Sequence, residues 1–346
     1  TQTDPANVQF VVGFNGTTNV KIAPGNIGGG GASDLNGLSD CVVNGQNQFI
    51  GNVPANITVN AISNTSLGHQ ALNSITTGDT NVAIGNASLS SINSQNNNTA
   101  VGSLALQFTT AISSTALGYQ AGGFGSGNTN GGSVYIGVKA GRSNIAQGHV
   151  SIGAEAGYSN TSGGDNTNVG YHAGYYNTTG QNNTMLGYDT GFHSTGSYNT
   201  FVGYRVGYGS SGNTTGERNV AIGDVALTAL TSGYRNVSIG TNSGQAITTG
   251  NQNVVIGDFA GSSLTTGVDN IVIGQNAQSS SATVSNEITL GASNITLLRI
   301  PGLGSTDGHV LQYSTSAGGI VLAAGGGGGG GATDLNGLSD CLVDTA

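Results

Sequence analysis

The chain has 346 residues, of which 62 are glycine and 7 % are charged, a composition unlike that of an ordinary enzyme core. With seven Lys and Arg and a formal net charge of −9, it is not expected to bind nucleic acid or to be held on an anionic membrane by charge. No run of about 18 apolar residues occurs, so no membrane insertion is expected. We expect no cofactor and no metal.

The first 62 residues precede a regular pattern. Two short β-like runs, at 8–12 and 20–23, and a glycine run make residues 1–31 a predicted β connector and Gly-rich linker. Residues 32–62 hold the phrase Asp34-Leu-Asn-Gly-Leu-Ser-Asp-Cys41 and a variable bridge. The oxygen-bearing side chains of this phrase favour a turn at a domain junction over a calcium loop, which needs more carboxylates at a stricter spacing.

A short phrase, Asn81-Val-Ala-Ile-Gly85, organises residues 63–294, where it recurs fourteen times with substitutions. Positions are numbered here from its glycine, which is position 0. The interval between successive glycines is nearly constant, and two intervals are longer than the rest. We predict that these glycines are structural anchors of a repeat: Gly68, Gly85, Gly102, Gly118, Gly137, Gly153, Gly170, Gly187, Gly203, Gly223, Gly240, Gly257, Gly274 and Gly291.

The positions around each anchor follow fixed residue types. Position −1 is Ile, Leu or Val, position −3 is Val, Ile or Thr, position −4 is usually Asn, and position +3 is usually Ala. Positions −3 and −1 share one face of a strand, and we predict that this face is buried. Asn at −4 predicts a turn before the strand, and Ala at +3 predicts a second, closely packed strand in each repeat.

The repeat, with a period of about 17 residues, is too short for a propeller blade or an ankyrin repeat and fits one coil of a β-solenoid. The predicted fold is therefore all-β, a parallel β-solenoid or β-roll of about 14 coils. With coils roughly 4.8 Å apart, the array would extend about 60 Å. Each coil offers only about three inward apolar groups to its own core, so we predict that three chains associate as a homotrimer rather than that the solenoid is a monomer.

The two long spacings between anchors mark insertions, which in repeat arrays form protrusions on one side. Aromatic residues also gather in the middle coils, where they form either a stacked packing ladder or a platform for glycan rings. The candidate binding residues for a host surface glycan or receptor come from these two features: Phe124, Asn128, Tyr204, Tyr208 and Asn213.

Other candidate groups carry weaker signals. The five histidines are scattered and are read as surface polar residues, and Glu155 and Asp165 are the sort of pair that hydrolyses glycans only if the fold brings them together. Cys41 and Cys341 end identical phrases at opposite ends of the chain. We interpret them as buried thiols or as thiols that pair with the same residue of another chain.

The end of the chain repeats its beginning. Residues 295–324 predict a β-hairpin connector, and residues 325–346 are a glycine run followed by the same Asp-Leu-Asn-Gly-Leu-Ser-Asp-Cys phrase. The match holds at one constant offset, which aligns Asp34 with Asp334 and Cys41 with Cys341. We interpret the chain as one module and the start of a second in a tandem string.

The repeat, as in Asn219-Val-Ala-Ile-Gly223, resembles the head repeats of trimeric autotransporter adhesins. That resemblance implies a left-handed parallel β-roll, three of which pack into a trimer. The longer phrase Thr248-Thr-Gly-Asn-Gln-Asn-Val-Val-Ile-Gly257 is similar to repeats in bacteriophage tail fibres and appendages, especially of marine cyanophage type. The connector phrases at 304–313 and 334–340 also resemble those fibres.

These features predict a non-enzymatic structural fibre protein of a phage virion, a trimeric rod for host attachment in a virion appendage. The first alternative is a bacterial cell-surface trimeric adhesin or extracellular filament subunit, located at the cell surface. A glycan-degrading spike is a second alternative, and it requires a cleft with paired carboxylates.

Overall fold

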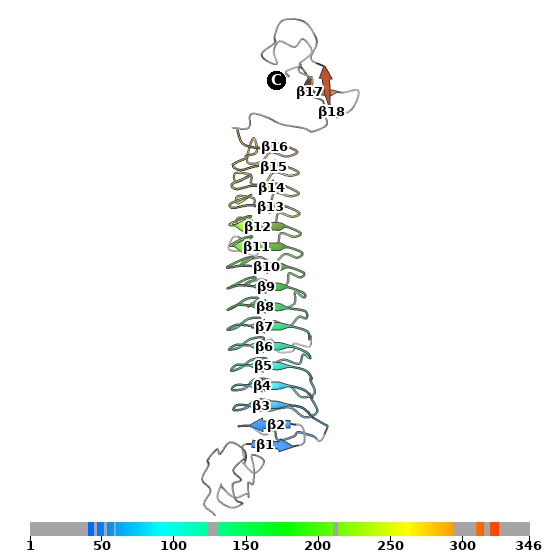
Figure 1. Ribbon diagram of the computed structural model, residues 1–346, viewed down its shortest axis with the longest axis vertical. Helices are drawn as coiled ribbons and strands as arrows, with labels where there is room; N and C mark the ends of the chain where they lie inside the picture. Colours follow the sequence, from blue (N-terminus) through cyan, green and yellow to red (C-terminus); the bar gives the residue numbers. More distant parts are fainter. Residues whose placement is uncertain are drawn as a thin grey trace, which may run out of the picture. The chain divides into compact units, whose positions relative to one another are not determined.

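A computed structural model describes residues 47–51, 54–58, 60–123, 131–209 and 214–293, and the backbone of 41–44, 309–314 and 319–324. The chain divides into two compact units, Thr1–Asn294 and Ile295–Ala346. The first holds a stack of coils, one above the other (Figure 1). The described part of the second is a two-stranded antiparallel hairpin of β17 (His309–Ser314) and β18 (Gly319–Ala324).

One sheet of sixteen strands runs the length of the first unit, and its strands follow in chain order (Figure 1). β1 pairs antiparallel with β2, and every later pairing is parallel, for example Val82 with Thr99. The predicted all-β parallel solenoid is confirmed. The strands are β1 (Cys41–Asn44), β2 (Asn47–Ile50), β3 (Thr65–Leu67), β4 (Val82–Ile84), β5 (Thr99–Val101), β6 (Thr115–Leu117), β7 (Val134–Ile136), β8 (Val150–Ile152), β9 (Thr167–Val169), β10 (Thr184–Leu186), β11 (Thr200–Tyr204), β12 (Val220–Asp224), β13 (Val237–Ile239), β14 (Val254–Ile256), β15 (Ile271–Ile273) and β16 (Ile288–Leu290).

The stack begins one coil earlier than the repeat pattern predicted. In β2, Phe49 is fully buried and pairs with Ser66 of β3, and Gly51 stands one repeat before the first predicted anchor, Gly68. Asn47 occupies position −4 of this extra coil. Its position −3 is a glutamine, which is not β-branched, so the repeat pattern did not identify this coil.

The anchor glycines occupy a place that no other residue fits. From Gly68 to Gly274 their φ angles lie between +124° and +143°, a region that L side chains rarely adopt. Each also faces the backbone of the next anchor: a Cβ on Gly85 would lie 2.7 Å from the carbonyl carbon of Gly102. The close approach of successive coils thus explains why glycine recurs at every turn.

The prediction that positions −3 and −1 point into the core is wrong. In β4 the fully buried residue is Ala83 at position −2, while Val82 and Ile84 on either side are partly or well exposed. The same order holds from β3 to β15. The two positions do share a face, as their spacing requires, but it is the outer one.

The predicted second strand is also wrong, because the residues after each anchor form turns in the described coils. Positions +2 and +4 take left-handed backbone angles, as at Ala87 (φ 53°) and Leu89 (φ 47°), which an extended strand excludes. Hydrogen bonds between coils continue through these turns, for example from Leu72 N to the Ser88 carbonyl. Ala at +3 is fully buried, as at Ala71.

A ladder of buried asparagines at position −4 joins the coils. The Asn64 Oδ1 atom accepts hydrogen bonds from the backbone N and the Nδ2 of Asn81, both at 3.0 Å. Each Nδ2 also donates to a carbonyl of the next turn, as Asn64 does to Gly78 at 2.8 Å. The ladder stops at Asn98 and restarts at Asn166; in between, position −4 holds Ser114, Ser133 and His149.

Core residues compensate for one another within many of the coils. A small residue at position −2, as at Ala83, is accompanied in four coils by a fully buried leucine at position +4, such as Leu89, whereas the coils of Ala116, Ser151 and Ser238 have glycine there. Where position −2 is large, as at Tyr135 or Phe201, position +4 is glycine, and a Cβ there would overlap with the ring. Two apolar clusters result, one from Phe49 to Ala140 and one from Phe201 to Ala277.

Candidate functional site

The predicted binding residues are only partly within the described structure. Phe124, Asn128 and Asn213 lie outside the described residues, so their role stays a prediction. Cys341 also lies outside them, and Cys41 is the first residue of β1, described by its backbone alone. Tyr204 and Tyr208 are described, and both belong to rows of side chains that run along the stack.

The apolar stripe comprises the outward side chains at positions −3 and −1 of β3 to β16. It holds only Thr, Val, Ile and Leu, and no charged residue. Many of its members are well exposed, among them Leu67 at 48 % and Leu290 at 52 %. Parallel pairing places equivalent members in line, such as Ile222 with Ile239, so the stripe is continuous along the stack.

The charge row occupies position +2 in five successive coils, where basic side chains alternate with carboxylates: Lys139, Glu155, His172, Asp189 and Arg205. Lys139 Nζ lies 3.1 Å from Glu155 Oε1. The imidazole of His172 faces a carboxylate at each nitrogen, with Nε2 3.3 Å from Glu155 and Nδ1 3.2 Å from Asp189. Arg205 Nε completes the row at 3.5 Å from Asp189. Each carboxylate therefore lies between two basic side chains of the neighbouring coils.

Two aromatic ladders flank this row. Tyr171, Tyr188 and Tyr204 stack at position +1, with centroids 5.2 and 5.4 Å apart. Tyr158, Tyr175, Phe192 and Tyr208 stack at position +5, at 4.8 to 5.2 Å. Within each ladder the ring faces lie against one another along the stack. Stacked faces are not free to receive sugar rings, so this geometry favours the packing interpretation over a glycan platform.

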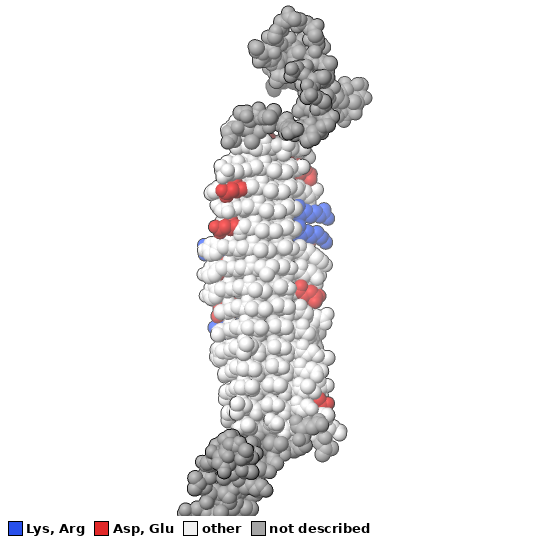
Figure 2. All heavy atoms as spheres, viewed as in Figure 1, with Lys and Arg blue, Asp and Glu red and all other residues white. Residues whose placement is uncertain are grey.

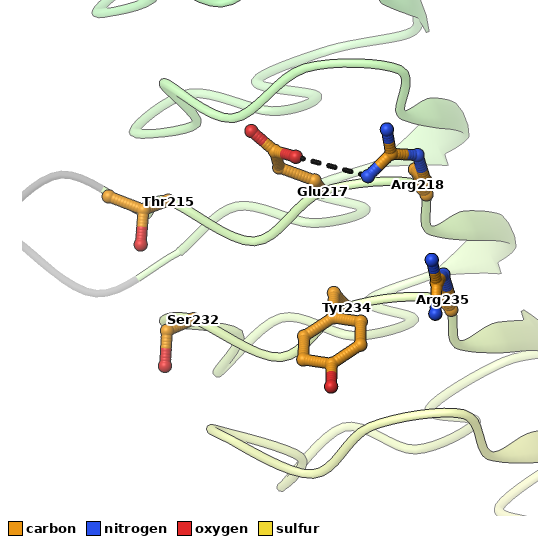
Figure 3. A pocket seen from close by; sticks show the side chains of 6 residues that line it. All are labelled: Thr215, Glu217, Arg218, Ser232, Tyr234 and Arg235. Carbon is orange, nitrogen blue, oxygen red and sulfur yellow. Dashed lines mark hydrogen bonds and ion pairs between the residues drawn. The ribbon is translucent and has the colours of Figure 1, made fainter.

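The arginine groove lies between two adjacent coils and is lined by Thr215, Glu217, Arg218, Ser232, Tyr234 and Arg235, with a volume of about 440 Å³ (Figure 3). Arg218 and Arg235 stand one above the other at position −5. Glu217 lies 3.5 Å from Arg218, and Arg218 also lies over the Tyr198 ring at 5.3 Å. Charged side chains are otherwise sparse on the face seen in Figure 2. Sequence reasoning missed this groove, although two arginines at the same position of successive repeats were a usable signal.

The interpretation of the histidines as surface residues is wrong for His149, which is buried in the gap of the asparagine ladder. His172 is partly exposed in the charge row, and His309 lies outside the residues whose side chains are described. Burial lowers the pKa of His149 from its ordinary value of 6.5 to about 4, against the raising effects of its hydrogen bond to Gly163 and of nearby Asp165. The Nε2 atom of His149 has no hydrogen-bond partner among the described side chains and backbone.

The two carboxylates considered for glycan hydrolysis belong to different rows. Glu155 pairs with Lys139 and His172 at position +2, while Asp165 lies at position −5 of the following coil. Within the described ranges, no three His, Cys, Asp or Glu side chains gather in a way that would hold a metal ion.

In the same ranges there is no helix with the length and apolar character needed to cross a bilayer. The chain matches no protein-family model, no curated protein and no solved structure.

Proposed function

We propose that this chain is a non-enzymatic structural segment of a fibre and that copies of it associate side by side as a parallel homotrimer. The observation that carries the proposal is the apolar stripe. A continuous exposed apolar surface is rare on a soluble monomer and usually marks an interface. Each square ångström removed from water contributes roughly 25 cal/mol, and the stripe recurs in every coil.

A second copy of the same chain is the partner that suits this surface best. The stripe repeats with the step of the coils, so a parallel copy in register presents an equivalent residue at every step. The stripe has no charges that would call for a complementary partner. Three narrow stripes meeting at a common axis cover one another and form a shared core, which is the arrangement that the adhesin resemblance implies.

We place the fibre in a phage virion appendage that spaces or presents a host-attachment tip. The support is the resemblance of the repeat and connector phrases to tail fibres, together with the constant offset between the two Asp-Leu-Asn-Gly-Leu-Ser-Asp-Cys phrases, which marks tandem modules. A cell-surface adhesin or filament subunit is the alternative, since it uses the same repeat. The sequence on either side of residues 1 and 346 separates the two, because further copies of the Asp34–Cys41 phrase favour the modular fibre.

Native mass spectrometry of the folded chain tests the association, with a mass of three chains as the expected result. The double variant Ile222→Glu and Ile239→Glu places two charges side by side on the apolar stripe and should yield monomers or unfolded chain. Thr266→Glu, at an exposed position outside the stripe, is the control and should keep the mass of three chains. A folded wild-type monomer, or a double variant with unchanged mass, would contradict the proposal.

A further inference from the structure

Like charges stand together at one place on the stack. Arg218 and Arg235 occupy the same position in adjacent coils, which are roughly 4.8 Å apart. Their side chains project on the same side (Figure 3). Of the two, Arg218 has a carboxylate 3.5 Å away, in Glu217, while Arg235 forms no ion pair with any described residue. Among the described side chains, one carboxylate therefore pairs with this group of two guanidinium cations.

This arrangement differs from that of the charge row. There, each carboxylate lies between two basic side chains, so the row is neutralised from within. The chain carries a net charge of −9 and only seven Lys and Arg, so two of them in adjacent coils are a local concentration of positive charge. The repulsion between the two arginines is relieved when an anion lies between them.

The lining of the arginine groove suits a sugar as well as an anion. Thr215, Ser232 and Tyr234 contribute hydroxyl groups that donate to and accept from sugar hydroxyls. Tyr234 is 40 % exposed, the Arg235 guanidinium carbon lies over its ring at 5.6 Å from the centroid, and no described aromatic ring stacks on it. The exposed part of this ring is thus available for the apolar face of a pyranose, unlike the rings within the two ladders.

We infer that the arginine groove binds an acidic polysaccharide, with a carboxylate or sulfate group held between Arg218 and Arg235 and a neighbouring sugar ring against Tyr234. Guanidinium groups bind such oxyanions through paired N–H donors. The inference rests on the proposed attachment function, because it names the kind of surface that the fibre would contact. Glu217 opposes the anion and limits affinity, so Glu217→Gln should tighten binding.

Binding of the full chain to immobilised polysaccharides tests the inference. The probes are alginate as a carboxylated chain, dextran sulfate as a sulfated chain and dextran as a neutral chain. We expect at least tenfold tighter binding to one or both acidic probes than to dextran, and the stronger of the two identifies the anionic group. Equal or no binding to all three would overturn the inference.

A matched pair of variants separates the groove from general charge. Arg218→Gln with Arg235→Gln removes two positive charges from the groove, and we expect at least a tenfold loss of acidic-polysaccharide binding. Arg142→Gln with Arg205→Gln removes two charges elsewhere and should change binding less than twofold. Equal losses in both doubles would show non-specific attraction and overturn the inference.

The mass of the groove variant distinguishes a failure of the polysaccharide inference from a failure of the fibre proposal. Arg218→Gln with Arg235→Gln should keep the mass of three chains. A loss of that mass would place the arginines at a subunit contact and overturn the glycan assignment. Conversely, a trimer that binds no acidic probe leaves the fibre proposal standing and removes only the inference about its ligand.

Discussion

The coils of β3 to β5 and those of β7 to β11 share one backbone path, but different side chains fill their cores. In the first group, small residues at position −2 face Leu at +4 and, at β3 and β4, Ile at +7, and the asparagine ladder is unbroken. In the second group, position −2 holds Tyr135, Met185 and Phe201 over glycines, together with the polar Ser151 and Asn168. The second group also carries the charge row and both aromatic ladders.

The difference shows which parts of the coil are fixed and which are interchangeable. Anchor glycines and hydrogen bonds between coils occur in both groups and define the backbone. Where position −2 holds a large residue such as Tyr135, Met185 or Phe201, its volume is matched by the absence of a side chain at +4. Substitutions that convert one kind of coil into the other should therefore be tolerated only in pairs.

The largest expected effect comes from the coil of β11. Phe201→Ala alone should lower the free energy of unfolding by about 3–5 kcal/mol, because it leaves a cavity above Gly207. Gly207→Leu alone should also destabilise, by about 1–3 kcal/mol or more, because its Cβ overlaps with the Phe201 ring. The double variant recreates the Ala221 and Leu227 pattern of the next coil and should recover much of the loss.

A double-mutant cycle measures this recovery from local hydrogen exchange around β11 and from melting temperatures at fixed protein concentration. Backbone strain at residue 207 is not expected to prevent recovery, since Leu227 occupies the same position with φ 49°. Additive losses in the double variant would show that volume is not conserved within the coil.

The second effect concerns the gap in the asparagine ladder. His149 is neutral in the folded protein down to its lowered pKa of about 4, whereas the unfolded chain binds a proton near pH 6.5. Folding stability should therefore fall as pH drops through 6.5 and level off below about 4, a total of roughly 3 kcal/mol. His149→Asn supplies the usual ladder residue and should both raise stability and remove this pH dependence.

Unfolding of both proteins between pH 7 and pH 4 provides the measurement. His69→Asn is the control. His69 lies exposed on the surface, so its substitution should leave the pH dependence of the wild type intact. A pH profile that is the same with and without His149 would contradict its assignment as a buried neutral group.

The sequence predicted the parts of this structure that the backbone dictates. The anchor glycines could be recognised in the sequence because only glycine adopts φ angles between +124° and +143° with the backbone of the next coil so close. Which face of each strand is buried could not be predicted, because alternation shows which residues share a face and not which face lies in the core. Position −2 was not identified as the core position, because its residues range in size from Ala83 to Tyr135.

The candidate sites were harder to predict for a related reason. Hydrogen bonds and ion pairs between coils join residues that are one full repeat apart in the sequence, so they emerge only when equivalent positions are aligned. The charge row and the arginine groove both follow from that alignment. The sequence left a stacked ladder and a glycan platform as alternatives for the aromatic residues, and the orientation of the rings, which favours the stack, required the structure.

The third effect lies in the polar core between the two apolar clusters. Asn168 is fully buried at position −2, and neither of its side-chain amide atoms has a hydrogen-bond partner among the described residues. Asn168→Val should stabilise the protein by about 1–2 kcal/mol, because it removes two unsatisfied polar atoms. Val255 over Gly261 shows that a coil accepts valine in this setting. Hydrogen exchange around β9 is the measurement, and faster exchange in the variant would instead indicate that Asn168 has a polar partner such as a buried water.

The smallest effect belongs to the charge row, where most of the paired side chains are partly exposed. Asp189 faces both His172 and Arg205, so Asp189→Asn interrupts the alternation at its most connected carboxylate. Asp189 itself is buried, but its partners are partly exposed and the amide of Asn still offers an acceptor oxygen, so we expect the melting temperature to fall by about 1–3 °C, less in high salt than in low salt. Asp269→Asn is the matched control, because its carboxylate accepts from Gln252 and pairs with no cation in the described structure. If the two variants lose the same amount at every salt concentration, the alternation of charge does not stabilise the middle coils, and their ion pairs only accompany the aromatic ladders.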